Sequence, residues 1–263
     1  MLAIYNTVSI LTIIIYTFVI IVLINNFNKE QIAKRFIDIF QFIALIISLS
    51  FIVYYWITID RTPLRTLWET RLWYAFFTAL IATIFKLYWK MNYMLIYGNL
   101  ITIIFILVNL LHPENFSKEL MPALQSYWFI PHVIVYIFSY ALFGIVTIMA
   151  IFNLIPKIKF KADIKDIDNI IYIGLAFLTL GLVFGALWAK EAWGSYWTWD
   201  PKEIWAMITW VIYLLYVHYR YGFQYSEKFN NYFIITAFVL LLICWFGINY
   251  LPVANQSVHT YTN

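Results

Sequence analysis

The sequence predicts an all-α polytopic membrane protein with about eight transmembrane helices. Hydrophobic residues make up 64% of the 263 residues and charged residues only 11%, and the mean hydropathy is +0.80. Apolar runs of about 18 residues or more, long enough to cross a bilayer, recur along the whole chain. The net charge of +4 is small and its basic residues are spread among short loops, so we expect membrane lipid as the surroundings and no nucleic-acid partner.

Eight apolar stretches are predicted to cross the membrane. They are residues 3–24, 36–59, 72–89, 93–111, 132–155, 169–189, 204–221 and 231–250. Residues 1–112 hold the first four, and residues 113–263 hold a core of the last four with an outer C-terminal tail. No linker or low-complexity tract separates the two parts, so one integrated domain is expected. The first stretch lacks the features of a cleaved signal peptide and is expected to stay as a helix.

The distribution of Lys and Arg predicts the orientation of these helices. With the N-terminus outside, 11 of the 17 basic residues fall in inner loops and 6 in outer segments. Basic residues favour the cytoplasmic side of short loops. We therefore expect both termini on the outer side of a bacterial cytoplasmic membrane, or of a thylakoid membrane.

The outer loop after the second stretch, residues 60–71 (DRTPLRTLWETR), contains Arg61, Arg65 and Arg71. One interpretation is that these side chains form surface ion pairs with acidic residues of the same loop. The other is that they bind the carboxylates of a ligand, because a guanidinium matches a carboxylate in a two-point hydrogen bond. The sequence leaves both open.

Half of the tryptophans are concentrated in residues 188–210 (WAKEAWGSYWTWDPKEIWAMITW). Two of them, Trp188 and Trp210, are expected as ordinary anchors at the membrane interface. The remainder crowd around Gly194 more densely than anchoring requires. Wide, rigid indole faces are suited to a large, flat, apolar ligand at the membrane surface.

A helix is predicted to start directly after this cluster. Asp200 suits the N-cap, Pro201 the first helical position, and Glu203 has the spacing of a capping box. The positive end of the helix would then face the cluster and favour an anionic group such as a propionate. In the preceding stretch, Gly181 and Gly185 form a pair of small residues that allows close helix packing.

The segment WGSYWTWDPKEIWAMITW resembles the tryptophan-rich WWD signature of the haem-handling proteins of cytochrome c maturation. Its WDPKE ending resembles the CcsA (ResC) branch of system II, and the similarity runs from about Pro122 to Tyr261. The resemblance implies that the bound group is haem b. It also implies that haem is bound by Trp193, Gly194, Tyr196, Trp197, Trp199, Asp200, Pro201, Glu203 and Trp205.

The resemblance also assigns roles to three histidines. His132, in PALQSYWFIPHVIVYIFSY, corresponds to an axial ligand of iron at the outer face. His259 corresponds to the second, although its setting Ser-Val-His-Thr-Tyr lacks a glycine that the family carries. His218 resembles a transmembrane haem ligand in a Tyr…His-x-Arg context. The residues alone leave structural alternatives open: a solvated histidine at a helix start for His132, a terminal residue for His259 and a side chain that reaches the inner interface for His218. His112, next to a helix-ending proline, is expected to be interfacial and not a ligand.

The family's activity is transport of haem to the outer face and its covalent attachment to apocytochrome c at a Cys-x-x-Cys-His motif. His218 lies roughly 27 Å from Asp200 by helical rise, which implies two haem positions. The second inner ligand would come from a CcsB/ResB-type membrane subunit, so the chain is expected to act as a haem lyase only with that partner. The alternatives are a haem exporter that delivers to a chaperone without ligation, and a b-type electron-transfer subunit.

Overall fold

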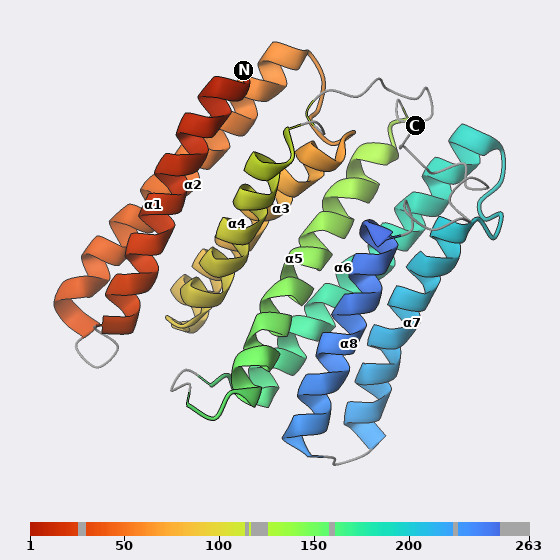
Figure 1. The fold of residues 1–263 in the computed structure, drawn as a ribbon. Coiled ribbons are helices and arrows are strands. Elements are labelled where there is room, and N and C mark those ends of the chain that lie inside the picture. Colours follow the sequence, from red (N-terminus) through yellow and green to blue (C-terminus); the bar gives the residue numbers. More distant parts are fainter. Residues whose placement is uncertain (26–29, 114–115, 117–125, 158–160, 223–225, 248–263) are drawn as a thin grey trace. The chain divides into compact units, whose positions relative to one another are not determined.

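The computed structural model describes residues 1–25, 30–113, 116, 126–157, 161–222 and 226–247. Within these residues the chain is all helical, which confirms the predicted fold class (Figure 1). The helices are α1 (Leu2–Asn25), α2 (Glu30–Ile59), α3 (Leu67–Trp89), α4 (Met94–Leu111), α5 (Phe129–Leu154), α6 (Ile164–Trp193), α7 (Pro201–Gly222) and α8 (Glu227–Trp245).

Seven of these described helices are long and apolar enough to cross a membrane, and α7 is the exception. It contains Lys202, Glu203, His218 and Arg220 among many aromatic residues, which lowers its hydropathy. Its 22 residues still extend roughly 33 Å, enough to span a hydrocarbon core. The chain is an integral membrane protein, and a crossing by α7 stays a prediction.

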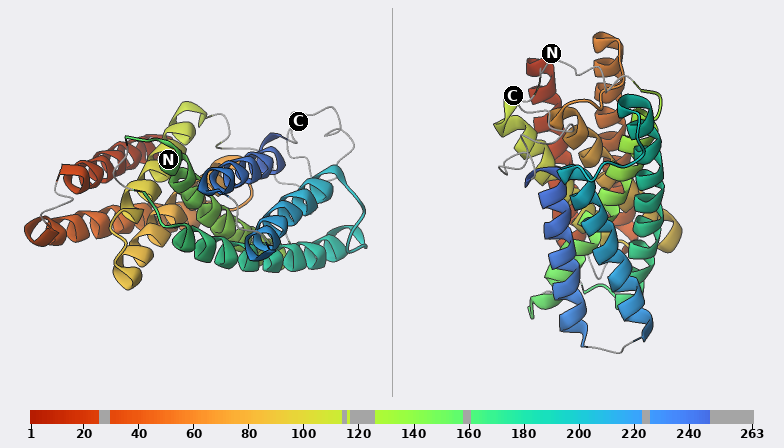
Figure 2. Two further views of the ribbon diagram at one scale, coloured as in Figure 1. Left: turned by 90° about the horizontal axis from the view of Figure 1, so that it is seen from below. Right: turned by 90° about the vertical axis from the view of Figure 1, so that its right-hand side faces the viewer.

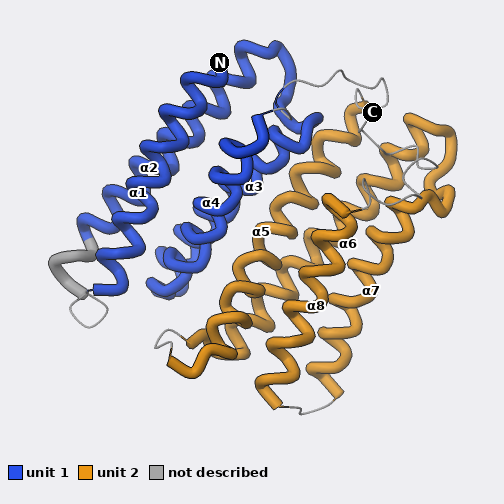
Figure 3. The backbone as a smooth tube through the Cα atoms, viewed as in Figure 1, with its two compact units in different colours: residues 1–119 blue, residues 120–263 orange. Residues whose placement is uncertain are grey.

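The helices separate into two compact units, Met1–Glu119 and Leu120–Asn263 (Figure 3). In the first unit α1 contacts α2, α2 contacts α3, α3 contacts α4, and α4 contacts α1. The second unit repeats this ring with α5, α6, α7 and α8. Helices that follow one another within a unit run in opposite directions (Figure 2). Each unit is therefore an up-and-down four-helix arrangement. The expectation of one integrated domain stays a prediction.

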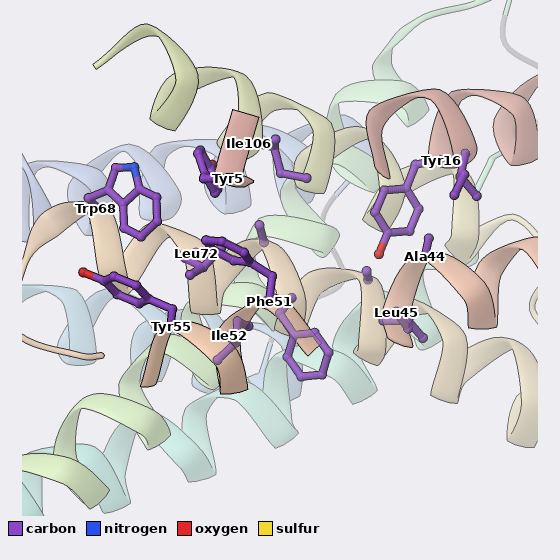
Figure 4. Packing of buried hydrophobic residues seen from close by; sticks show 14 residues of the cluster. Tyr5, Tyr16, Ala44, Leu45, Phe51, Ile52, Tyr55, Trp68, Leu72 and Ile106 are labelled. Atoms are coloured by element: carbon purple, nitrogen blue, oxygen red, sulfur yellow. The ribbon is translucent and has the colours of Figure 1, made fainter. Parts of the chain in front are cut away.

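Aromatic side chains fill the core of the first unit at one end (Figure 4). Trp68, at the start of α3, is fully buried and meets three rings edge-on: Tyr5 at 4.6 Å, Phe116 at 4.8 Å and Tyr55 at 5.5 Å between ring centroids. Such edge-to-face pairs stabilise beyond the area that they bury. They join α1, α2 and α3 to the residues that follow α4.

Polar side chains join the helices of this unit deeper in the bundle. The amides of Gln41 in α2 and Asn99 in α4 donate to each other at 3.1 and 2.9 Å, and Gln41 also donates to Thr83 of α3 at 3.0 Å. Nearer the other end, Lys86 of α3 pairs with Asp38 of α2. Within lipid such polar contacts stabilise helix association, because no water competes for them.

In the second unit, α5 packs closely on α6 at three glycines of α6. A Cβ atom added at Gly174, Gly181 or Gly185 would lie 2.7–2.9 Å from Phe143, Tyr136 or His132, respectively. The close approach expected from Gly181 and Gly185 is confirmed, and Gly174 extends it by two turns. Farther along, Phe143 stacks on Tyr213 of α7 with 3.6 Å between ring centroids.

The contact between α3 and α4 generates a test of packing. A Cβ at Gly98 would meet the side chain of Ala82 and lie 2.8 Å from the carbonyl oxygen of Thr78. We expect Gly98→Ala to push these helices apart and lower the free energy of unfolding by about 1–3 kcal/mol. The measurement is the thermal midpoint of the purified protein in detergent. Gly222→Ala is the matched control, since no heavy atom lies within 4 Å of its added Cβ. Equal shifts in the two variants would contradict the packing argument.

Candidate functional site

His132 lies in the first turn of α5, and its ring is held by α6. Pro131 precedes it and costs the helix no hydrogen bond, because the N–H groups in the first turn of a helix have no acceptor within the helix. The Nδ1 atom of His132 lies 2.9 Å from the carbonyl oxygen of Gly181. A carbonyl only accepts, so Nδ1 carries the hydrogen, and the lone pair of the neutral ring is on Nε2. This is the arrangement that metal-binding histidines usually have.

The packing around His132 fixes the plane of its ring. The ring fills the space left by the absent side chain of Gly185. Tyr136, one turn later, meets it edge-on at 4.6 Å between centroids, and Trp188 lies at 5.4 Å and a tilt of 32°. An imidazole restrained on three sides loses little rotational freedom when it binds a further atom.

Trp188 has a different role from the one that the sequence predicts. It is only 4% exposed, packing on Phe129 at 5.2 Å and on Trp193 at 4.9 Å between centroids, as well as on His132. The expectation of an interfacial anchor is therefore wrong for this residue. The signal that could have found it is spacing, because Gly181, Gly185 and Trp188 follow the i, i+4, i+7 pattern of one helix face.

The chain leaves α6 through Gly194, which has a φ of 83° and donates its N–H to the carbonyl of Lys190 at 3.0 Å. Glycine takes this left-handed conformation without steric cost, and it commonly ends a helix. The Nζ atom of Lys190 donates to the Gly194 carbonyl at 2.8 Å and lies 5.5 Å from the ring centre of Tyr196. Lys190 therefore holds the first half of the loop.

The loop presents aromatic rings to its surroundings. Tyr196 is 56% exposed and Trp199 is 63% exposed, whereas Trp193 and Trp197 are half-buried. The rings of Trp197 and Trp199 are nearly perpendicular, with 6.0 Å between centroids. Two large exposed rings in one short loop form an apolar surface that the described part of unit 2 does not cover.

The start of α7 shows the Glu203 half of the expected capping box, and the Asp200 side chain caps the N–H of Lys202. The Glu203 carboxylate accepts from the N–H of Asp200 at 3.1 Å, and the Asp200 carboxylate accepts from the N–H of Lys202 at 2.9 Å. Asp200 is 7% exposed and Glu203 is 9% exposed, so both acids are nearly buried. Two carboxylates of the chain itself thus occupy the positive end of the helix. They reduce its attraction for a ligand propionate, which we had expected to bind there.

The remaining tryptophans of the stretch lie on α7. Trp205 is half-buried one turn into the helix, and its carbonyl accepts from the hydroxyl of Thr209 at 2.8 Å. Trp210 donates its indole N–H to the hydroxyl of Thr179 in α6 at 2.9 Å. Trp210 therefore connects two helices of unit 2.

His218 is exposed near the end of α7, where its Nδ1 atom lies 2.9 Å from the carbonyl oxygen of Leu214. This contact again places the lone pair of a neutral ring on Nε2. Arg220 makes a two-point pair with Asp168 at the start of α6, and Tyr216 donates to the same carboxylate at 2.7 Å. Since His132 contacts the last turns of α6, the two histidines lie at opposite ends of unit 2.

The arginine loop belongs to unit 1. Arg61 pairs with Glu69 through two hydrogen bonds of 2.7 and 3.0 Å, and Glu69 is fully buried. The pKa of Arg65 is lowered, first by burial of the side chain and second by the charge of Arg61. The charge of Glu69 acts in the opposite direction but does not cancel these two effects. Arg71 is 8% exposed. The ion-pair interpretation is therefore correct for Arg61. Its partner, Glu69, is buried, whereas we expected a pair at the surface. Ligand binding by this loop stays a prediction.

The described residues offer an oriented imidazole at His132 and no cluster of metal-binding side chains around it. Among the described residues, no three His, Cys, Asp or Glu side chains are grouped closely enough to hold a bare ion. A single oriented imidazole on the same unit as an exposed aromatic loop can serve as one protein ligand of haem iron. His259, the other predicted outer ligand, lies outside the described residues.

Comparison with known proteins identifies the family of the chain. The family described as "Cytochrome C assembly protein" matches residues 64–254. A "Cytochrome c biogenesis protein CcsA" from Prochlorococcus marinus subsp. pastoris is 31% identical over 305 residues, covering 98% of this chain and 94% of that protein. The protein of the same name from Chlamydomonas reinhardtii is 32% identical over 224 residues, covering 78% of this chain and 62% of the relative, so the chain spans less than two thirds of its length.

A solved structure shares the fold. "Cytochrome c Heme Lyase CcmF" aligns with a TM-score of 0.65 and 16% identity, covering 93% of this chain and 46% of the CcmF chain. At this identity the likeness concerns the fold alone. The family match covers more than half of the chain, and the cyanobacterial relative is matched over nearly its full length. The chain therefore belongs to the cytochrome c assembly protein family and is a CcsA-type cytochrome c biogenesis protein.

Proposed function

We propose that this protein carries haem b to the outer face of its membrane and attaches it covalently to apocytochrome c, in a complex with a CcsB/ResB-type subunit. The observation that supports this most directly is the setting of His132. Its ring is restrained by α6, its Nδ1–H is bonded to the Gly181 carbonyl, and the exposed rings of the loop follow on the same unit.

The chain's own residues would bind and orient the substrates. The Nε2 atom of His132 would hold haem iron from one side, and His259 would hold it from the other. Tyr196 and Trp199 would cover part of the macrocycle and keep water from it. Haem supplies two vinyl groups as electrophiles, and apocytochrome c supplies two thiols.

The chemistry needs no oxidant and no nucleophile from this chain. Each thiol adds across one vinyl double bond, so a carbon–sulfur bond forms and the thiol hydrogen ends on the other vinyl carbon. Holding both reactants in a fixed orientation can account for much of the acceleration of such a step. The substrate histidine of the Cys-x-x-Cys-His motif would then replace one axial ligand of the protein.

His218 would ligate a second haem nearer the inner face. A histidine within the membrane is costly unless it has a partner, and this side chain is exposed on unit 2. The CcsB/ResB-type subunit would supply the opposite ligand, so the inner haem would form only in the complex. With both termini on the outer side, haem would enter at His218 and leave at His132.

The outer ligand can be tested by cavity rescue. We expect His132→Gly to lose the outer haem from the purified complex and to stop cytochrome c maturation, because iron loses an oriented imidazole. Added imidazole should restore part of both, since the space beside Gly185 and Trp188 remains. The measurements are the visible absorption spectrum and the amount of covalent haem in a reporter cytochrome. His112→Ala is the matched control. Normal maturation by His132→Gly without imidazole would refute the assignment.

The inner ligand can be separated from fold stability by a pair of neighbouring substitutions. We expect His218→Ala to deplete the inner haem of the complex and to leave the thermal midpoint of the haem-free chain unchanged, because the side chain is exposed. Arg220→Ala should instead lower the free energy of unfolding by about 3 kcal/mol, because it leaves the buried Asp168 carboxylate without its pair. Haem content by pyridine haemochrome and thermal midpoints in detergent distinguish the two. If His218→Ala kept its full haem content, the inner site would have to lie elsewhere.

A further inference from the structure

Trp199 has an unusual backbone conformation. Its φ is 60°, in the left-handed region that L-residues with bulky side chains rarely adopt. Among the described residues only Asp60 and Lys90 share a positive φ without being glycine. Strained residues of this kind persist only where the surroundings hold them, and they gather at functional sites.

One carboxylate oxygen accepts hydrogen bonds from the backbone on both sides of Trp199. Oε2 of Glu203 accepts from the N–H of Thr198 at 2.7 Å and from the N–H of Asp200 at 3.1 Å, which are the two neighbours of Trp199. The hydroxyl of Thr198 also lies 3.3 Å from it. Glu203 is only 9% exposed, so water competes little with these bonds.

The capping box of α3 provides a comparison within the same chain. There Oε2 of Glu69 accepts from Arg65 and Thr66, two consecutive N–H groups at 2.7 and 3.1 Å. No residue lies between them, and Arg65 has no positive φ. A cap of α7 requires only the bond to Asp200. At α7 the same oxygen also accepts from Thr198, on the other side of Trp199. This additional bond distinguishes the start of α7 from that of α3, and the residue between its two bonded neighbours is the one in the left-handed conformation.

We infer that Glu203 is a positioning residue that holds Trp199 in the left-handed conformation and so fixes the direction in which its exposed indole points. The direction of a Cα–Cβ bond follows from the backbone, so a change of φ at residue 199 would turn the ring away from the surface that it forms with Trp197. This inference rests on the proposed function in one respect, namely that the surface binds haem.

The energetic consequence is pre-organisation. A ring already held in its binding direction does not lose conformational freedom when the ligand arrives. Without Glu203 the backbone at Trp199 would relax toward negative φ. If the competent conformer fell to about a tenth of the population, apparent haem affinity would fall roughly tenfold.

The experiment uses the full chain in complex with its partner subunit, with a fluorinated tryptophan placed only at position 199. We expect one ¹⁹F resonance in the parent protein, a shifted or broadened one in Glu203→Met, and an intermediate one in Glu203→Gln, whose neutral oxygen accepts more weakly. Ser226→Ala is the matched control, since it removes an ordinary N-cap bond of α8. Its resonance should equal that of the parent.

Haem retention is measured on the same samples by dilution, with roughly tenfold weaker retention expected for Glu203→Met. An unchanged resonance in both Glu203 variants would overturn the positioning role, whatever the haem result. A changed resonance with unchanged haem retention would support the positioning role and count against the proposed haem surface instead. If Glu203→Met does not assemble, Glu203→Gln carries the same test, and a resonance identical to that of the parent overturns the inference.

Discussion

The three glycines at which α6 meets α5 are the feature on which unit 2 depends. Helices surrounded by lipid gain little from apolar burial, so close packing must hold them together. Gly174, Gly181 and Gly185 allow α5 to approach until its aromatic and imidazole rings touch the α6 backbone. The same absence of side chains opens the Gly181 carbonyl to His132. The close packing of α5 on α6 and the tautomer of His132, a candidate iron ligand, therefore both follow from these glycines.

The aromatic loop depends on the two helices that flank it. Lys190, in the last turn of α6, binds the Gly194 carbonyl, and Glu203, in the first turn of α7, binds the backbone on both sides of Trp199. Two residues in this loop have a positive φ, namely Gly194 and Trp199. Gly194 accepts the bond from Lys190, and Trp199 lies between the two N–H groups that Glu203 binds. A short loop held at both ends can present large exposed rings without the entropy cost of ordering them at binding.

Local features were predictable from the sequence, and long-range partners were not. Hydropathy predicts the helices, the Asp200–Glu203 spacing predicts a helix start, and the Gly181–Gly185 pair predicts close packing, because each rule concerns neighbours in the chain. The burial of Trp188 and the pairing of Arg220 with Asp168 depend on which helix faces which. Periodicity identifies the face of a helix but not the helix that it meets. Arg61 and Glu69 lie only eight residues apart in the chain, so their pairing was foreseeable, whereas full burial of Glu69 required the fold.

The end of unit 2 that carries His218 shows that a histidine close to an arginine in sequence can have different partners from that arginine. In sequence, His218 and Arg220 are only two residues apart. In the structure, Arg220 and Tyr216 bind Asp168 inside the unit, and His218 remains on the outside. The buried carboxylate fixes the end of α7 against the start of α6, which gives the exposed imidazole a rigid base. An imidazole that is rigid, exposed and bonded only to its own helix at Nδ1 suits ligation completed by a second subunit better than ligation within one chain.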